Sequence, residues 1–246
     1  MASIYRRRSG FFEDRHRRTL HAATRIAERT GRLLGEAPKR VLDVGCGVGT
    51  FLHAFAAAGA TDLLGLEGEW LERKHIVIDP DRVHRHDLRE PLPETGRFDL
   101  VISLEVAEHL PANRAASFVA ELCDRGPAVL FSAAIPLQGG VGHLNEQWPS
   151  WWAELFAAER FRPVDGVRPA IWSDEAVATW YRQNTVLYLH PDHPASENAT
   201  FVDDLAALDL VHPQLYLDKT PGNGIGKAWK ALARATRRSI RQALQG

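Results

Sequence analysis

The sequence has few cysteines and no long apolar run, and both absences exclude classes of protein. Cys46 and Cys123 are too few for a fold held together by disulfides, and neither belongs to a cysteine pair with metal-site spacing. No stretch approaches about 18 uncharged apolar residues, so we expect no transmembrane helix. The N-terminal segment lacks the apolar core of a secretion signal, which indicates a cytoplasmic protein in a reducing compartment.

Net charge is also nearly absent, at −1, but the two signs are unevenly spread. Residues 1–40 carry 11 basic and four acidic side chains, and residues 218–246 carry seven basic and one acidic, so the middle of the chain is acidic. Basic ends of this kind bind nucleic acid, an anionic lipid surface or an anionic substrate, or form the solvated face of a helix. With 45% hydrophobic residues, the chain can form an ordered core.

Short apolar runs alternate with helical patterns, which predicts an α/β fold with a mostly parallel, seven-stranded sheet flanked by helices. Apolar residues recur at helical spacing from Phe11 to Leu34, so we expect an N-terminal helix there. The predicted strands cover residues 40–44, 61–67, 83–87, 98–105, 127–134, 161–167 and 184–190, the last as an antiparallel edge. This alternation is typical of a Rossmann-like domain.

A glycine turn after the first strand is the strongest functional signal. Gly45, Gly47 and Gly49 follow Asp43 in this turn, and glycines there let a ligand approach the backbone N–H groups of a helix N-terminus. Glu67 ends the second strand, where an acid can hold both hydroxyls of a ribose. The dinucleotide pattern G-x-G-x-x-G requires glycine at position 50, which is threonine here. Two interpretations of the turn stay open at this point: it binds a nicotinamide dinucleotide, or its glycines only allow a tight turn.

This turn resembles motif I of the class I S-adenosylmethionine (SAM)-dependent methyltransferases, and the resemblance continues over roughly residues 38–165. It implies a Rossmann-like fold with SAM as the cofactor. The implied cofactor-binding residues are Asp43, Gly45, Cys46, Gly47, Gly49, Glu67, Gly68, Asp87, Leu88, Leu104 and Glu105. We predict a helical lid at residues 1–37, a SAM-binding domain at 38–190 and a helical extension at 191–246.

The segment after the fourth strand contains Glu105, Glu108 and His109, which would share one face if this turn were helical. His143, in a glycine-rich segment after the fifth strand, is a fourth candidate ligand. The E-x-x-E-H string resembles the metal-binding motif of ubiquinone-pathway O-methyltransferases and of small-RNA 2'-O-methyltransferases, which implies a divalent ion such as Mg²⁺ or Zn²⁺. Similar strings occur in methyltransferases without a metal, and a surface role for Glu108 also stays open.

The candidate catalytic residues are His143, His109 and Glu146. Of these, His143 is the candidate general base, because a neutral imidazole can accept a hydroxyl proton near pH 7. The segment with His143 follows a strand at the edge of the sheet where open α/β folds bind their ligands. Further along the chain, the polar side chains of Tyr181, Arg182 and Gln183 either line the acceptor pocket or only end a helix.

These observations predict a methyltransferase that acts on a hydroxyl of a small molecule, such as a sugar-containing or natural-product metabolite. The alternatives are metal-assisted 2'-O-methylation of RNA and SAM binding without catalysis. Nucleic acid is disfavoured as a partner because the middle of the chain is acidic. A basic helix expected from Ile225 to Leu244 is compatible with a membrane surface, with the domain itself and with a partner subunit, so the oligomeric state is left open.

Overall fold

The computed structural model describes residues 11–220, 226, 229, 232–233 and 235–236. The chain divides into two compact units, of which the first ends at Leu210 and the second begins at Val211. The second unit contains helix α7 (Pro213–Lys219), and most of the basic helix expected from Ile225 to Leu244 lies outside the described residues. Within the described part of the chain, we find no helix with the length and apolar content needed to span a bilayer.

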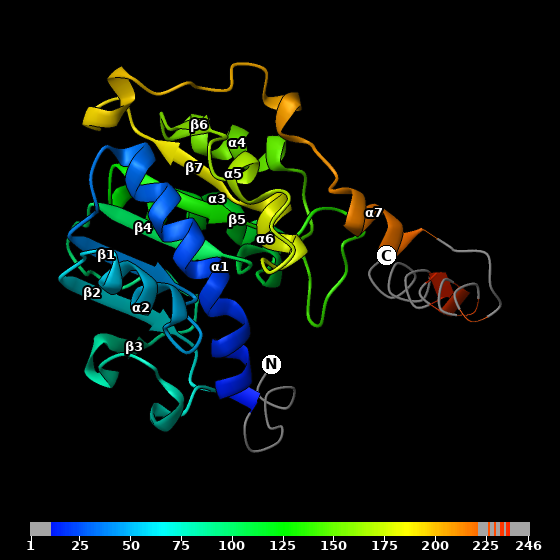
Figure 1. The fold of residues 1–246 in the computed structure, drawn as a ribbon, viewed down its shortest axis with the longest axis horizontal. Helices are drawn as coiled ribbons and strands as arrows, with labels where there is room; N and C mark the ends of the chain where they lie inside the picture. The colour runs from blue at the N-terminus through cyan, green and yellow to red at the C-terminus, as the bar shows by residue number, and fades with distance from the viewer. Residues whose placement is uncertain (1–10, 221–225, 227–228, 230–231, 234, 237–246) are drawn as a thin grey trace. The chain divides into compact units, whose positions relative to one another are not determined.

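The first unit is built on one sheet with the strand order β3-β2-β1-β4-β5-β7-β6 (Figure 1). The strands are β1 (Arg40–Val44), β2 (Asp62–Glu67), β3 (Val83–Arg85), β4 (Leu100–Leu104), β5 (Ala128–Ser132), β6 (Arg162–Val164) and β7 (Val186–Leu189). Strands β1 to β5 pair in parallel, and β7 is antiparallel to β5 and β6. The predicted seven-stranded, mostly parallel sheet is confirmed. The expectation of an edge strand at 184–190 is wrong, because β7 lies between β5 and β6.

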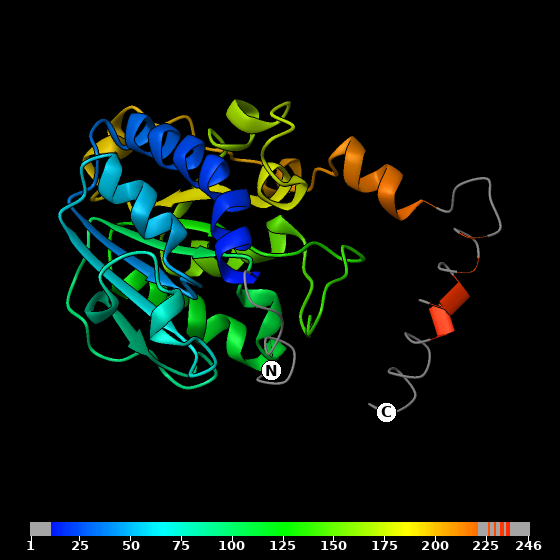
Figure 2. The ribbon, with the colours of Figure 1, turned by 60° about the horizontal axis from the view of Figure 1, so that its bottom comes forward.

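Helices cover both faces of the sheet, as Figures 1 and 2 show. Those of the first unit are α1 (Phe11–Leu34), α2 (Thr50–Ala57), α3 (Ala115–Asp124), α4 (Pro149–Ala158), α5 (Arg168–Ile171) and α6 (Thr179–Asn184). One face carries α1, α2, α5 and α6, and the other carries α3 and α4. The bounds of α1 agree with the sequence pattern, since alanines and Ile26 at helical spacing form its buried face.

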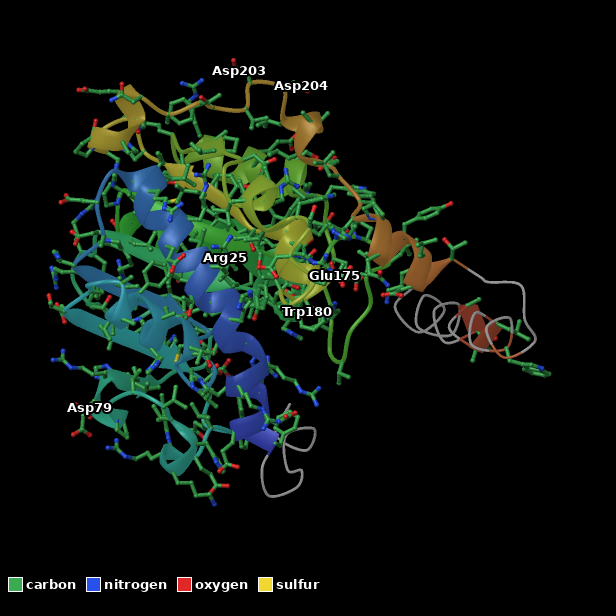
Figure 3. All side chains as sticks on the ribbon, viewed as in Figure 1. Arg25, Asp79, Glu175, Trp180, Asp203 and Asp204 are labelled. Atoms are coloured by element: carbon green, nitrogen blue, oxygen red, sulfur yellow. The ribbon has the colours of Figure 1, made fainter. Side chains whose placement is uncertain are left out.

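The central strands are apolar on both sides because each face of the sheet is covered. In β4, Leu100 and Ile102 pack against the helices of one face, whereas Val101 packs against those of the other. Charged side chains such as Asp79 and Asp203 lie on the outside of the unit (Figure 3).

The strand order determines at which point of the sheet a ligand can bind. Strand β1 pairs with β2 on one side and with β4 on the other. The chain runs outwards from β1 through β2 to β3 and then crosses to the other side of β1 to form β4. Such a switch point opens a crevice at the carboxyl ends of the strands, where α/β proteins bind ligands. The glycine turn at 45–49 and the segment from Glu105 to His109 both begin at this edge.

Candidate active site

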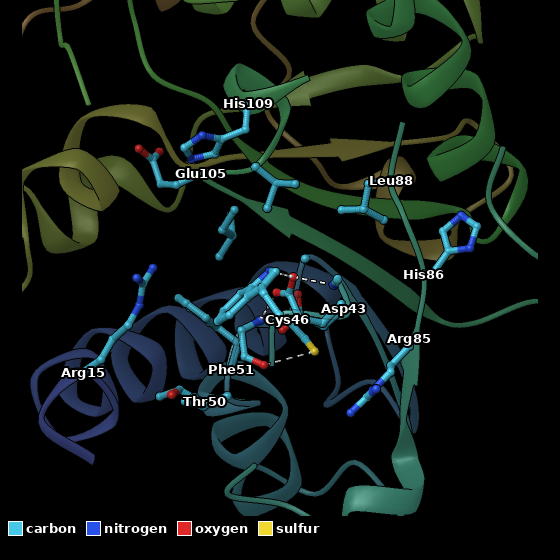
Figure 4. Close-up of a pocket in the computed structure, with 18 of the residues that line it drawn as sticks. Arg15, Asp43, Cys46, Thr50, Phe51, Arg85, His86, Leu88, Glu105 and His109 are labelled. Atoms are coloured by element: carbon cyan, nitrogen blue, oxygen red, sulfur yellow. Dashed lines mark hydrogen bonds between the residues drawn. The ribbon is translucent and has the colours of Figure 1, made fainter. Parts of the chain in front are cut away.

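A cavity of about 760 Å³ lies at the carboxyl ends of β1, β2 and β4. Of the eleven residues predicted to bind the cofactor, ten line it: Asp43, Gly45, Cys46, Gly47, Glu67, Gly68, Asp87, Leu88, Leu104 and Glu105. Figure 4 shows several of them around the cavity, with Leu88 and His86 at one side and Glu105 and His109 at another. The structure therefore gathers these residues from four strand ends into one site.

Each glycine of the turn has a positive φ angle, but the three have different surroundings. Gly45 has φ +87°, and a Cβ atom there would lie 2.4 Å from Val106 Cγ2. At Gly47 a Cβ would meet no atom within 4 Å. Gly49, which does not line the cavity, has φ +86° and caps α2. The turn thus combines left-handed backbone with close packing against the segment after β4.

Two buried acids, Asp43 and Glu67, lie at the ends of β1 and β2. Burial, and then the charge of Glu67, raise the pKa of Asp43 to about 8, and its Oδ2 atom has no hydrogen-bond partner. The Glu67 carboxylate accepts hydrogen bonds from the backbone N–H groups of Gly47 and Gly68, both at 2.7 Å. Burial raises the pKa of Glu67, although these hydrogen bonds oppose the shift. The unpartnered buried oxygen of Asp43 fits a ligand that brings a cationic group or a hydrogen-bond donor.

The side of the cavity that follows β3 carries Asp87 and Leu88, two of the residues predicted to bind the cofactor. Leu88 lines the cavity, and Asp87 accepts hydrogen bonds from the guanidinium of Arg89. These hydrogen bonds lower the pKa of Asp87 to about 2. The carboxylate is therefore ionised at neutral pH.

Helix α1 forms part of the cavity wall, which is compatible with the predicted lid. Phe12, Arg15 and Thr19 line the cavity from α1, and Arg15 points towards it in Figure 4. Phe12 packs with Val48 of the glycine turn and stacks on Trp70 at 6.1 Å between ring centroids. These contacts were not predicted individually, because the sequence pattern marks the face of a helix but not its partner.

His109 is the predicted catalytic residue that lines the cavity. Its Nδ1 atom lies 3.3 Å from the carbonyl oxygen of Gly142. A carbonyl only accepts, so Nδ1 carries the proton and Nε2 of the neutral ring keeps a lone pair. Burial, and then the neighbouring His143, lower the pKa of His109. The ring is thus suited to accept a proton at Nε2.

The other two predicted catalytic residues, His143 and Glu146, are not among the residues that line the cavity. His143 Nδ1 donates to Glu146 Oε1 at 2.8 Å, and the same carboxylate accepts from the backbone N–H groups of Leu137 and Gly139. Burial raises the pKa of Glu146, but these hydrogen bonds together bring it below its usual value. Glu146 therefore holds the glycine-rich segment and the His143 ring in place.

Three of the four predicted metal ligands come together. One donor atom each from Glu108, His109 and His143 lies within 4.8 Å of the others, the one such group found among the described residues. Both histidines use Nδ1 for the contacts described above, which leaves Nε2 for an ion. Glu108 is buried, and its Oε2 atom has no hydrogen-bond partner. This donor set fits a divalent cation such as Zn²⁺ or Mg²⁺.

Glu105 is not part of this metal group. The 3₁₀ turn that follows β4 covers only Ala107–His109, and Glu105 precedes it with φ +57°. The condition for a shared helical face is therefore not met. The Glu105 carboxylate instead accepts hydrogen bonds from the side-chain amides of Gln138 and Asn184.

The buried amides around Glu105 were missed by sequence reasoning, apart from Gln183. Gln138 follows β5, whereas Gln183 and Asn184 end α6. No short-range pattern joins these segments, so local sequence patterns contain no signal for the cluster. Tyr181, also from α6, lines the cavity. This is what the first of its two predicted alternatives, a place in a pocket wall, requires.

Comparisons with known proteins show what the domain as a whole resembles. The sequence profile of a methyltransferase-domain family matches residues 13–187. A ubiquinone biosynthesis O-methyltransferase of Escherichia coli O157:H7 is 31% identical over 157 residues, which cover 61% of this chain and 60% of that protein. The chain thus spans less than two thirds of the length of the curated relatives it matches.

Solved structures share the fold at low sequence identity. The sugar N-methyltransferase KedS8 from Streptoalloteichus sp. ATCC 53650 aligns with a TM-score of 0.54 at 15% identity, covering 70% of this chain and 87% of that one. DesVI from Streptomyces venezuelae aligns with a TM-score of 0.51 at 16% identity, covering 70% and 92%. At these identities the likeness concerns the fold alone.

Proposed function

Because the chain belongs to the class I SAM-dependent methyltransferases, we propose that it transfers a methyl group to a hydroxyl of a small molecule. The observation that carries this proposal is the cavity at the switch point, which joins the glycine turn and two buried acids to a histidine with a lone pair. SAM supplies an electrophilic methyl group when it is bound. The residues of the chain then have to hold the reactants in line and remove one proton.

The two ends of the cavity would serve the cofactor and the acceptor. The glycine turn, Asp43, Glu67 and the Asp87-Leu88 pair would hold SAM, since they line one continuous cavity. His109 lines the same cavity and would accept the hydroxyl proton at Nε2. Its Nδ1 contact with Gly142 fixes the ring and its tautomer. The named O-methyltransferase relative supports a hydroxyl acceptor.

A sugar or natural-product acceptor remains part of the proposal. The KedS8 similarity concerns a sugar N-methyltransferase, so the screen described below includes amines. Methyl transfer from labelled SAM to phenols, catechols, sugar hydroxyls and matched amines would identify the acceptor class. Methylation of amines alone would refute the hydroxyl acceptor, and methylation of an RNA oligonucleotide alone would refute the small-molecule acceptor.

His109→Gln tests the proton acceptor. We expect turnover to fall by about 10²-fold or more, because general bases contribute about 10²–10⁴-fold, while affinity for S-adenosylhomocysteine stays nearly unchanged. The control is His53→Gln, since His53 lies on α2 and does not line the cavity. Undiminished turnover of the His109 variant would remove His109 from this role.

A second candidate mechanism uses a metal at the same place. The unpartnered Glu108 Oε2 and the donor atoms of His109 and His143 favour it. A divalent ion there would acidify the acceptor hydroxyl. Dialysis against a chelator followed by metal analysis separates the two candidates. Full activity of a metal-free protein supports His109 as the base, whereas activity restored only by added ion supports the metal.

A further inference from the structure

One arginine of helix α1 faces the cavity without an ionic partner. Arg15 lines the cavity, and it forms no ion pair with any residue that the structure describes. Arg17 and Arg18, on the same helix, both pair with Asp14. A guanidinium is charged throughout the physiological pH range, and its planar shape matches a carboxylate through two parallel hydrogen bonds. The proposed chemistry assigns this charge no role.

Arg15 lies on the side of the cavity that carries the proposed proton acceptor. In Figure 4 its side chain lies on the side of His109, and Arg85 lies on the opposite side. Arg85 ends β3, close along the chain to the residues expected at the nucleoside, and Arg89 pairs with Asp87. Of the three described arginines that line the cavity, Arg15 is therefore the one placed to meet the acceptor.

Tyr181 of α6 adds a hydroxyl group to the cavity wall. The residue is 8% exposed, and its ring packs edge to face on Phe51 at 5.4 Å between ring centroids. Both rings line the cavity, so this contact fixes the direction of the Tyr181 ring. Burial raises the pKa of Tyr181, and the charge of Arg15 is the largest cause that lowers it. The hydroxyl thus stays protonated at neutral pH and can donate a hydrogen bond to an anion near Arg15.

Two acids of the cavity wall have partners other than Arg15. Glu105 accepts hydrogen bonds from the amides of Gln138 and Asn184. Glu67 accepts hydrogen bonds from two backbone N–H groups. Arg15 is also exposed, whereas Glu67 is buried, so the charge of Arg15 lies at the mouth of the cavity, where a second reactant enters. A carboxylate of that reactant finds the guanidinium unpaired.

We propose that Arg15 and Tyr181 bind a carboxylate of the acceptor, so that the substrate is a hydroxy acid. The inference rests on the proposed function, since the hydroxyl of the same molecule gives its proton to His109. One donor from α1 and one from α6 hold the acid, while the hydroxyl points to Nε2 of His109. Binding at two points orients the acceptor oxygen, and orientation supplies a large part of the rate in such a transfer. The arrangement gives the unpaired cation at the mouth of the cavity a use.

Matched acids and amides test this site by calorimetry on the complex with S-adenosylhomocysteine. The probes are protocatechuate with its amide and glucuronate with its amide, so each pair differs only at the carboxylate. The acid preference is the ratio of the two affinities in a pair. In the unaltered protein it should reach about tenfold in at least one pair, because hydrogen bonds between charged groups are stronger than neutral ones. Arg15→Gln should reduce it to less than about twofold, and Arg15→Lys, which keeps the charge, should retain part of it. Tyr181→Phe, which keeps the ring contact with Phe51, should weaken the acid more than the amide.

Arg17→Gln is the control, since Arg17 lies on the same helix, pairs with Asp14 and does not line the cavity. It should change none of the affinities. Equal binding of acid and amide in both pairs by the unaltered protein would overturn the proposal, as would the failure of both acids to bind. If Arg15→Gln weakened S-adenosylhomocysteine and left the acid preference unchanged, Arg15 would belong to the cofactor and the proposal would also be wrong. If the unaltered protein bound no S-adenosylhomocysteine, the proposed function would fail instead.

Discussion

Replacement of Gly45 by alanine separates backbone strain from steric overlap in the glycine turn. Gly45 has φ +87°, and an added Cβ would lie 2.4 Å from Val106 Cγ2 and 2.9 Å from Cγ1. The left-handed backbone costs an L-residue about 1–2 kcal/mol. Overpacking adds about 1–3 kcal/mol, since the β1 and β4 ends on either side are fixed by sheet pairing. We expect Gly45→Ala to lower the free energy of unfolding by about 2–5 kcal/mol.

Gly47→Ala is the matched control, because its φ is +55° but its Cβ would meet no atom within 4 Å. It should lose only the backbone part, about 1–2 kcal/mol. Val106→Ala in the Gly45→Ala background removes both clashing methyl groups, so the double variant should regain about 1–2 kcal/mol relative to additivity.

Urea denaturation followed by circular dichroism measures the free energy of unfolding of the unaltered protein, of the three single variants Gly45→Ala, Gly47→Ala and Val106→Ala, and of the double variant. In thermal scans, each 1 kcal/mol corresponds to about 2–4 °C for a chain of this size. The steric overlap would be refuted if Gly45→Ala and Gly47→Ala were equally destabilising and the effects of Gly45→Ala and Val106→Ala were additive. Backbone strain would then be the sole cause of the destabilisation.

Two further predictions concern buried charges. Burial raises the pKa of Asp43 to about 8, above its value in the unfolded chain, so its stabilising contribution is complete at about pH 4 and is lost as the pH rises towards 8. Scanning calorimetry should show this loss of stability in the unaltered protein and a smaller loss in Asp43→Asn. Parallel curves of stability against pH for the two proteins would contradict the prediction. Arg168 is buried and pairs with Asp165 at 2.8 Å, so Arg168→Met should cost about 3–5 kcal/mol in urea denaturation. The exposed pair of Arg162 with Asp203 is the control, and Arg162→Met should cost less than about 1 kcal/mol. Similar losses of stability in the two variants would refute the argument that burial sets the energetic cost of removing the arginine.

Local sequence patterns were sufficient for the framework of the site. Asp43, the glycine turn and Glu67 lie at strand ends that periodicity alone located, because each strand is a short apolar run followed by a turn. The helix from Phe11 to Leu34 was likewise predicted with its bounds. The edge position of the last strand was not, because pairing partners depend on the order of strands in the sheet.

Local sequence patterns were a poorer guide beyond β4. The expected helical face with Glu105, Glu108 and His109 does not form, because the turn is a short 3₁₀ helix that begins after Glu105. The sequence favoured His143 as the candidate base. The packing of the 137–146 segment gives the two histidines different partners, since Glu146 holds His143 and the carbonyl of Gly142 faces His109.

The sequence by itself determined the α/β alternation, the methyltransferase family and the turn that forms the cavity floor, because these depend on residues close together along the chain. Only the tertiary structure decided which groups surround Glu105. Asn184 lies 79 residues from it and Gln138 lies 33, and the pairing of β4 with β5 and of β5 with β7 brings them together. Hydrogen bonds between such distant residues leave no periodic trace, so they emerge only when the sheet is complete.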